Sequence, residues 1–132
     1  MTGILREARS PAEAAPLFAG MYGEDTVVSE QRLTRMCAGG WRLSVWPEGD
    51  SIIAFALWMD MVEYVFLRSF AVDPSRREGG RGRRFFEALR VEAWPSGRQI
   101  RLEVAPDGPR AFWERLGLRV KSTGMWLPEG AA

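Results

Sequence analysis

An uninterrupted apolar run over residues 52–59 constrains the fold more than any other feature of the sequence. Its eight residues are too few for a membrane-spanning helix, which takes about 20. The run follows a turn signal, Pro47-Glu48-Gly49-Asp50, and its length suits a strand. A strand that is apolar on both faces has to be covered on both sides. Residues 51–59 therefore predict a strand that is covered on both sides.

The neighbouring segments extend this strand into an antiparallel meander. Residues 41–46 have the period-two alternation that is typical of a strand. The chain then turns at Asp60 and Met61, and residues 63–72 form the third strand.

Apolar residues recur at helical spacing outside the meander. A first helix starts at Ser10, where serine can cap and Pro11 suits the first turn, and it stops at Gly23. A second helix starts at Ser29 and stops at Gly39-Gly40. The remaining segments are a first strand over residues 4–8, a third helix that stops at residues 94–97, a strand over 100–105, a short helix over 109–116 and a last strand over 118–126. The order βααβββαβαβ predicts one α/β or α+β domain over residues 1–132.

Missing residue types narrow the chemistry. The sequence has no histidine, no asparagine and a single cysteine, Cys37. Ser-His-Asp and Cys-His pairs are therefore excluded, as are zinc sites of the usual Cys/His kind, and no metal is expected. An intrachain disulfide is impossible, and with no signal peptide or membrane segment predicted we expect a cytoplasmic protein. Proton transfer is left to carboxylates, Tyr22, Tyr64 and Lys121.

Positive charge is concentrated in one short segment. Residues 76–84 contain five arginines and one acidic residue, whereas the rest of the chain holds 13 basic and 16 acidic residues. A local excess on a nearly neutral protein favours a small anionic ligand over a broad nucleic-acid surface.

The same segment is rich in glycine and lies between a predicted strand and a predicted helix. Gly79, Gly80 and Gly82 permit close backbone approach, and the first amides of a helix attract phosphate. No Gly-Lys-Ser/Thr follows, so this is not a P-loop, and the glycine spacing of a dinucleotide fingerprint is missing. The alternative is an exposed Gly/Arg turn that only caps the helix.

Residues 77–82, Arg-Glu-Gly-Gly-Arg-Gly, resemble the Arg/Gln-x-x-Gly-x-Gly/Ala signature of the GNAT superfamily of N-acetyltransferases. The preceding Phe-Ala-Val-Asp-Pro at 70–74 is similar to the strand that leads into this loop in the family. Downstream, residues 101–104 and 112–118 resemble the fifth strand and the "FYERLGF" helix end. The resemblance covers about residues 51–118.

This resemblance implies a mixed, mostly antiparallel sheet with helices on both faces. It also implies acetyl-CoA or a related acyl-CoA as co-substrate, and an acyltransferase for groups other than aminoacyl groups, in which an amine attacks the thioester directly. Dimers are common in the superfamily, so the resemblance is compatible with a homodimer. The cofactor-binding residues that it implies are Phe70, Ala71, Val72, Arg77, Glu78, Gly79, Gly80, Arg81, Gly82, Arg83 and Trp113.

The catalytic residues depart from the family pattern. The tyrosine that many members use as general acid falls at Trp113, whose indole cannot transfer a proton near neutral pH. We predict packing against the cofactor arm for Trp113, with a purely core role as the alternative. Glu103, in a Leu-Glu-Val context that carries the base in relatives acting on protein N-termini, is the candidate base. Its alternative role is an ion pair with Arg68 or Arg101.

Asp60 and Glu63, at a strand junction, are further candidate bases, with solvated turn residues as the alternative. Two other functions stay open. One is a CoA-binding regulatory or interaction module without turnover, and the other is nucleic-acid binding through the arginine cluster. The amine acceptor is not identified by the sequence.

Overall fold

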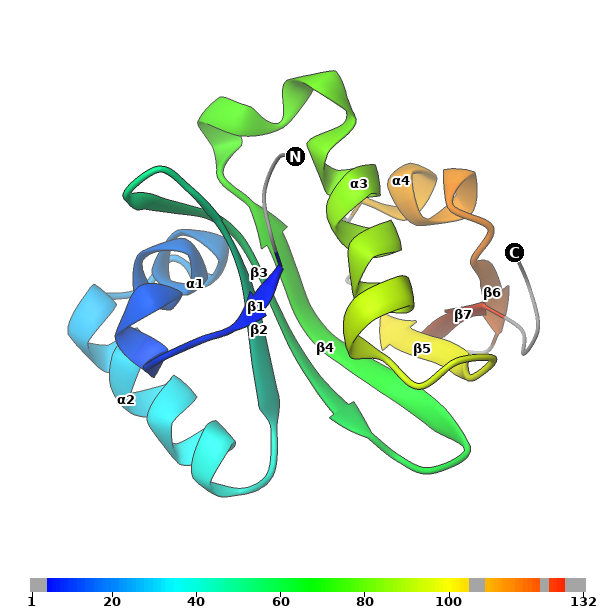
Figure 1. Ribbon diagram of the computed structural model, residues 1–132, viewed down its shortest axis with the longest axis horizontal. Helices are drawn as coiled ribbons and strands as arrows, with labels where there is room; N and C mark the ends of the chain where they lie inside the picture. The colour runs from blue at the N-terminus through cyan, green and yellow to red at the C-terminus, as the bar shows by residue number, and fades with distance from the viewer. Residues whose placement is uncertain (1–4, 105–108, 122–123, 128–132) are drawn as a thin grey trace.

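The computed structural model describes residues 5–104, 109–121 and 124–127 (Figure 1). The strands form one sheet in the order β1-β2-β3-β4-β5-β7-β6. The strands are β1 (Arg6–Glu7), β2 (Arg42–Glu48), β3 (Ser51–Asp60), β4 (Tyr64–Val72), β5 (Gln99–Glu103), β6 (Arg119–Lys121) and β7 (Gly124–Leu127). The α-helices are α1 (Ala15–Tyr22), α2 (Thr26–Ala38), α3 (Arg81–Ala88) and α4 (Arg110–Arg115), and the shorter helical turns are η1 (Pro11–Glu13), η2 (Pro74–Arg76), η3 (Glu78–Gly80) and η4 (Leu89–Ala93).

The sheet is antiparallel except between β4 and β5, which are parallel. Helices α1 and α2 lie on one side of the sheet, and α3 and α4 lie on the other (Figure 1). The predicted fold class is therefore confirmed, and the predicted order of elements agrees with the structure as far as the last strand. Among the described residues, no helix is long and apolar enough to cross a membrane.

Both faces of β3 are covered, as its apolar run predicts. Phe55 and Leu57 belong to the core cluster under α1 and α2. Ala56 and Trp58 belong to the cluster under α3 and α4. The alternation of a strand thus distributes one apolar run between two cores.

Four details of the predicted elements are wrong. Helix α2 begins at Thr26 rather than Ser29, because the Asp25 carboxylate accepts hydrogen bonds from the amides of Val27 (2.8 Å) and Val28 (3.3 Å). Ser10 makes no side-chain cap. The first strand is reduced to β1, and residue 4 lies outside the described residues. The last strand is a hairpin, in which β6 and β7 pair antiparallel.

An ion pair joins β1 to η1. The guanidinium of Arg6 donates two hydrogen bonds to the Glu13 carboxylate, at 3.0 and 2.7 Å, and the Arg9 amide donates a third at 2.6 Å. The side-chain hydrogen bonds from Arg6 lower the pKa of Glu13 from 4.5 to about 2, against the opposing effect of burial.

This lowered pKa predicts an acid-sensitive contribution to stability. A carboxyl with a lowered folded-state pKa stabilises the fold above its unfolded value, here 4.5, and loses that effect as the pH falls through about 2. We expect Glu13→Gln to lower the free energy of unfolding at pH 6, and the difference from the wild type to shrink steadily below pH 4.5. Urea unfolding at a series of pH values measures both curves. A difference that does not change between pH 6 and pH 2 would contradict this assignment.

Candidate functional site

The central feature of the site is the place where β4 and β5 part. The two strands pair only from Tyr64 opposite Gln99 to Leu67 opposite Leu102. Strand β4 continues to Val72, and among the described residues no strand pairs with this edge beyond Leu67. Within residues 5–104, 109–121 and 124–127, no strand takes up the outward backbone amides and carbonyls of this segment, which are groups that an extended ligand can hydrogen-bond.

A β-bulge in β4 sets which side chains face this opening. Leu57 of β3 pairs with Ser69, but the next residue, Trp58, pairs with Leu67, so Arg68 is an extra residue in β4. Before the bulge, Leu67 packs in the core under α3 and α4. After it, Phe70 packs on that same side, since the extra residue shifts the alternation by one.

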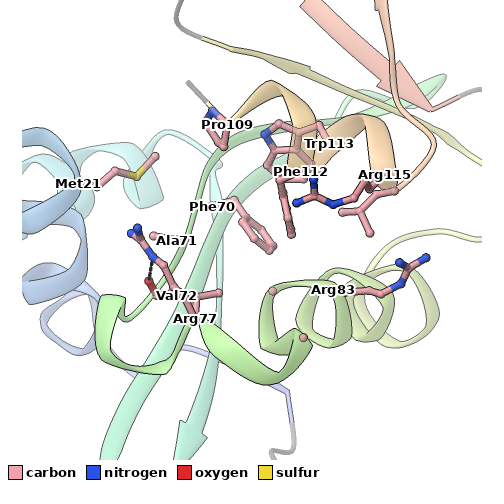
Figure 2. Close-up of a pocket in the computed structure, with 13 residues that line it drawn as sticks. Met21, Phe70, Ala71, Val72, Arg77, Arg83, Pro109, Phe112, Trp113 and Arg115 are labelled. Carbon is pink, nitrogen blue, oxygen red and sulfur yellow. Dashed lines mark hydrogen bonds between the residues drawn. The ribbon is translucent and has the colours of Figure 1, made fainter. Parts of the chain in front are cut away.

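A cavity of about 620 Å³ occupies the opening. Figure 2 shows Phe70 pointing toward Phe112 and Trp113, with Met21 reaching in from α1. The cavity is lined by Met21, Phe70, Ala71, Val72, Arg77, Gly80, Gly82, Arg83, Pro109, Phe112, Trp113, Arg115 and Leu116. Its volume is in the range of small-molecule and cofactor sites, about 300–1,000 Å³.

The Gly/Arg segment forms the floor of the cavity at the start of α3. The Asp73 carboxylate caps the turn η2 by accepting from the Ser75 amide (3.0 Å) and hydroxyl (2.9 Å), and these hydrogen bonds lower the pKa of Asp73. Gly79 and Gly80 have φ of 80° and 73°, the left-handed conformation that favours glycine. The chain then enters α3 at Arg81, so the first free amides of that helix lie next to the cavity-lining Gly80.

Gly82 contributes in a different way, through a close contact with α4. A Cβ added to Gly82 would lie 3.1 Å from Cε1 of Phe112 and 3.2 Å from its Cζ. The missing side chain thus lets the first turn of α3 approach α4 closely. This contact forms one wall of the cavity.

The five arginines of the segment have different partners. Arg76 and Arg81 both pair with Glu48, the latter at 3.8 Å. The Arg84 guanidinium donates to the carbonyl of Gly79 at 2.7 Å. Of these five, only Arg77 and Arg83 line the cavity, and Arg77 also donates from Nε to the Val72 carbonyl at 3.2 Å (Figure 2). The segment therefore contributes less positive charge to the cavity than its sequence suggests, and α4 adds Arg115.

Most of the cofactor-binding residues named from the sequence come together around this cavity. Gly79 and Arg81 do not line it, and Glu78 contributes backbone to η3. Trp113 is only 6% exposed, and its ring lies 5.1 Å from that of Phe70 and 5.7 Å from that of Phe86. Trp113 therefore combines core packing with a place in the cavity wall.

The candidate bases lie elsewhere. Glu103 is exposed at the end of β5 and does not line the cavity. Among the described residues Arg68 forms no ion pair with Glu103, and the role of Glu103 stays a prediction. The Asp60 carboxylate pairs with Arg98 and accepts a hydrogen bond from the Val62 amide at 2.8 Å. These contacts fit the alternative interpretation of Asp60 as a turn residue. Within the described part of the chain, no group of three or more Cys, Asp or Glu side chains is arranged to hold a metal ion.

Other cavity residues were not foreseen from the sequence. Met21 comes from α1, 49 positions before Phe70, and Pro109, Arg115 and Leu116 come from the α4 region. The hydroxyl of Tyr22 also forms a 2.8 Å hydrogen bond with that of Ser69, which is 2% exposed, and so ties α1 to β4. No local pattern marks these residues, because the fold alone brings the two helices to the opening.

Comparison with known proteins supports the fold assignment. No protein-family model and no curated protein sequence matches the chain. Among solved structures, it is similar to the ribosomal-protein-S18-alanine N-acetyltransferase of Escherichia coli, with a TM-score of 0.77 and 19% identity over 98% of this chain and 96% of that chain.

Two further similar structures are an aminoglycoside 6'-N-acetyltransferase complexed with coenzyme A and a Desulfovibrio desulfuricans protein assigned to the GNAT family of acetyltransferases. The first has a TM-score of 0.74 and 15% identity over 93% of this chain and 94% of that chain. The second has a TM-score of 0.65 and 18% identity over 94% of each chain. Similarity at this level of identity concerns the fold, and the fold of this chain is that of the GNAT N-acetyltransferases.

Proposed function

We propose that this protein is an acyl-CoA-dependent N-acyltransferase, with acetyl-CoA as its co-substrate and a primary amine as acceptor. The observation that carries this proposal is the joint placement of the open β4 edge and the left-handed glycine turn on one cavity. The open strand edge suits an extended arm that contains amide groups. The glycine turn at the start of a helix suits a diphosphate. The solved CoA complex of a protein with the same fold supports this choice of ligand.

The residues present fit such a ligand. The first amides of α3, reached through Gly80, are donors for the diphosphate, and the guanidiniums of Arg77 and Arg83 add charge beside them. The open backbone between Arg68 and Val72 offers donors and acceptors to the amides of the pantetheine arm. When bound, acetyl-CoA supplies an activated acyl group.

The chemistry requires positioning and one proton transfer. The amine nitrogen forms a bond to the acyl carbon, and the carbon–sulfur bond breaks with its electron pair on sulfur. One proton leaves the nitrogen, and the CoA thiolate takes up a proton from solvent. Holding both reactants in the opening contributes most of the rate, as expected for a reaction without a covalent enzyme intermediate. We assign the role of proton acceptor to Glu103. It is the last residue of β5, it follows the last β5 residue that pairs with β4, and its side chain is accessible to solvent.

A screen of amines for release of free CoA tests this function. The purified protein is given acetyl-CoA and one amine at a time, drawn from amino acids, polyamines, aminoglycosides and short peptides, and the new thiol is measured. We expect release above the amine-free rate with at least one class. If acetyl-CoA binds but no amine causes release of free CoA, the protein is instead a CoA-binding module without turnover. The tryptophan at position 113, where many family members have a catalytic tyrosine, is the sequence feature that favours this alternative.

A further inference from the structure

The bulge in β4 directs two consecutive side chains to the same face of the sheet. The guanidinium carbon of Arg68 lies 5.3 Å from the ring centroid of Trp41, which packs at the margin of the core under α1 and α2. The hydroxyl of Ser69 bonds to Tyr22 of α1 on that same side. Arg68 therefore lies at the point where β4 and β5 part, on the face opposite Phe70.

Arg68 differs from every other arginine that stacks on an aromatic ring in the described structure. It is exposed, and within the described residues its guanidinium has neither a hydrogen-bond nor an ion-pair partner. The other three stacked guanidiniums have polar partners: Arg32 on Phe18 pairs with Glu24 at 2.7 Å, Arg42 on Trp58 pairs with Glu7 at 3.0 Å, and Arg101 on Tyr64 donates to Gln99 at 2.9 Å.

A stacked guanidinium is held flat against the ring, while its edge keeps several N–H donors in a fixed fork. This fork matches a carboxylate, which can accept two parallel hydrogen bonds. The ring fixes the orientation of Arg68 before any ligand arrives, so less side-chain entropy is lost on binding. Arg68 is thus preorganised for a planar anion that the described structure itself does not provide.

The position of Arg68 relates this anion site to the reaction. Phe70, which lines the cavity, follows two residues later, and two strand residues span roughly 7 Å. Glu103 ends the neighbouring strand one residue beyond Leu102, the partner of Leu67, and adjacent strands lie about 4.8 Å apart. A cation and a carboxylate therefore stand on neighbouring strands at the opening, a pattern complementary to a molecule that carries both a carboxylate and an amine.

We infer that Arg68 binds the carboxylate of the acceptor, and that the acceptors are small amines of the amino-acid type. This inference rests on the proposed function, because it treats the open face beside β4 and β5 as the side from which the amine approaches. Trp41 and Phe66, whose rings are 6.0 Å apart on this face, form an apolar wall for the acceptor's side chain. A phosphate dianion suits the site less well, because Glu103 would repel its larger charge.

The test compares acceptors that differ only in the carboxylate. Phenylalanine and β-alanine are each paired with the corresponding primary amide, and kcat/KM is calculated per concentration of unprotonated amine. We expect the wild type to prefer the carboxylates by about 10- to 100-fold, the usual effect of a charge-assisted hydrogen-bonded pair. Arg68→Gln should abolish the preference, and Arg68→Lys should keep part of it, since lysine retains the charge but loses the fork.

Arg42→Gln is the matched control. Arg42 also stacks on an indole, but it is already paired with Glu7 and its ring partner belongs to the core under α3 and α4. We expect this variant to keep the preference for carboxylates, and all variants to keep the wild-type affinity for CoA. An unaltered preference in Arg68→Gln, or an equal loss in both variants, would overturn the inference.

A binding measurement separates this inference from the proposed function. Calorimetry of the CoA-loaded protein with N-acetylphenylalanine and with its amide requires no turnover. A preference for the acid that Arg68→Gln removes would support the carboxylate site even if every amine failed to release CoA. Equal binding of the acid and the amide would overturn the site even if CoA release from neutral amines confirmed the enzyme.

Discussion

Replacing Gly80 with valine is expected to weaken CoA binding by about 100-fold or more, the effect of losing roughly two hydrogen bonds to a charged group. Gly80 lines the cavity with φ of 73°, which costs an L-residue about 1–2 kcal/mol and a β-branched one more. A valine side chain would also stand between the ligand and the first amides of α3. Calorimetric titration with CoA measures the change.

Gly97→Val controls for backbone strain. Gly97 has a similar φ of 77°, and like Gly80 it has open space where a Cβ would be, but it lies in the turn before β5 and does not line the cavity. Both variants should lose a similar amount of stability in urea unfolding, and Gly97→Val should keep the CoA affinity of the wild type. If folded Gly80→Val binds CoA as the wild type does, the diphosphate does not bind at this turn.

Glu103→Gln is expected to lower kcat by about 100- to 10,000-fold, the usual contribution of a positioned base. Glutamine keeps the shape of the side chain and removes its basicity. Because Glu103 does not line the cavity, CoA affinity should stay near the wild-type value. Steady-state CoA release with the best amine of the screen measures kcat.

Two other substitutions sharpen the result. Trp113→Phe should keep most of the activity, because Trp113 contributes packing against Phe70 and Phe86 and no proton. Glu63→Gln removes an exposed carboxylate next to the start of β4 and should have little effect. Normal turnover in Glu103→Gln together with a slow Glu63→Gln would move the base to Glu63.

The central strand, the meander and the helical segments follow from the sequence because apolar periodicity is a local property. The N-terminus of α2 does not follow from the sequence, because two residues of the capping type lie close together there. Ser29 is a good capping residue by type, but Asp25 caps instead, and Ser29 is buried in the helix. The final hairpin does not follow from the sequence either, because strands this short carry too few alternations to reveal the turn between β6 and β7.

The glycine turn of the site could be predicted from the sequence, because it is one contiguous segment. The net charge of the site could not be predicted in this way. Glu48, 28 residues before Arg76, pairs with two of the five arginines, and no count within a short window detects such a partner. Met21 and the α4 residues likewise reach the cavity only through the tertiary fold.

The bulge at Arg68 also has a consequence for variation in β4. The extra residue determines which face of the sheet each later side chain of β4 points to. Phe70 and Val72 therefore reach the cavity because of their distance from the bulge as much as because of their residue type. Loss or gain of a single residue between Leu67 and Phe70 would exchange the two faces of the strand end, turning Ala71 toward α3 and the aromatic ring toward α1. This segment should therefore tolerate new side chains far more readily than a new length.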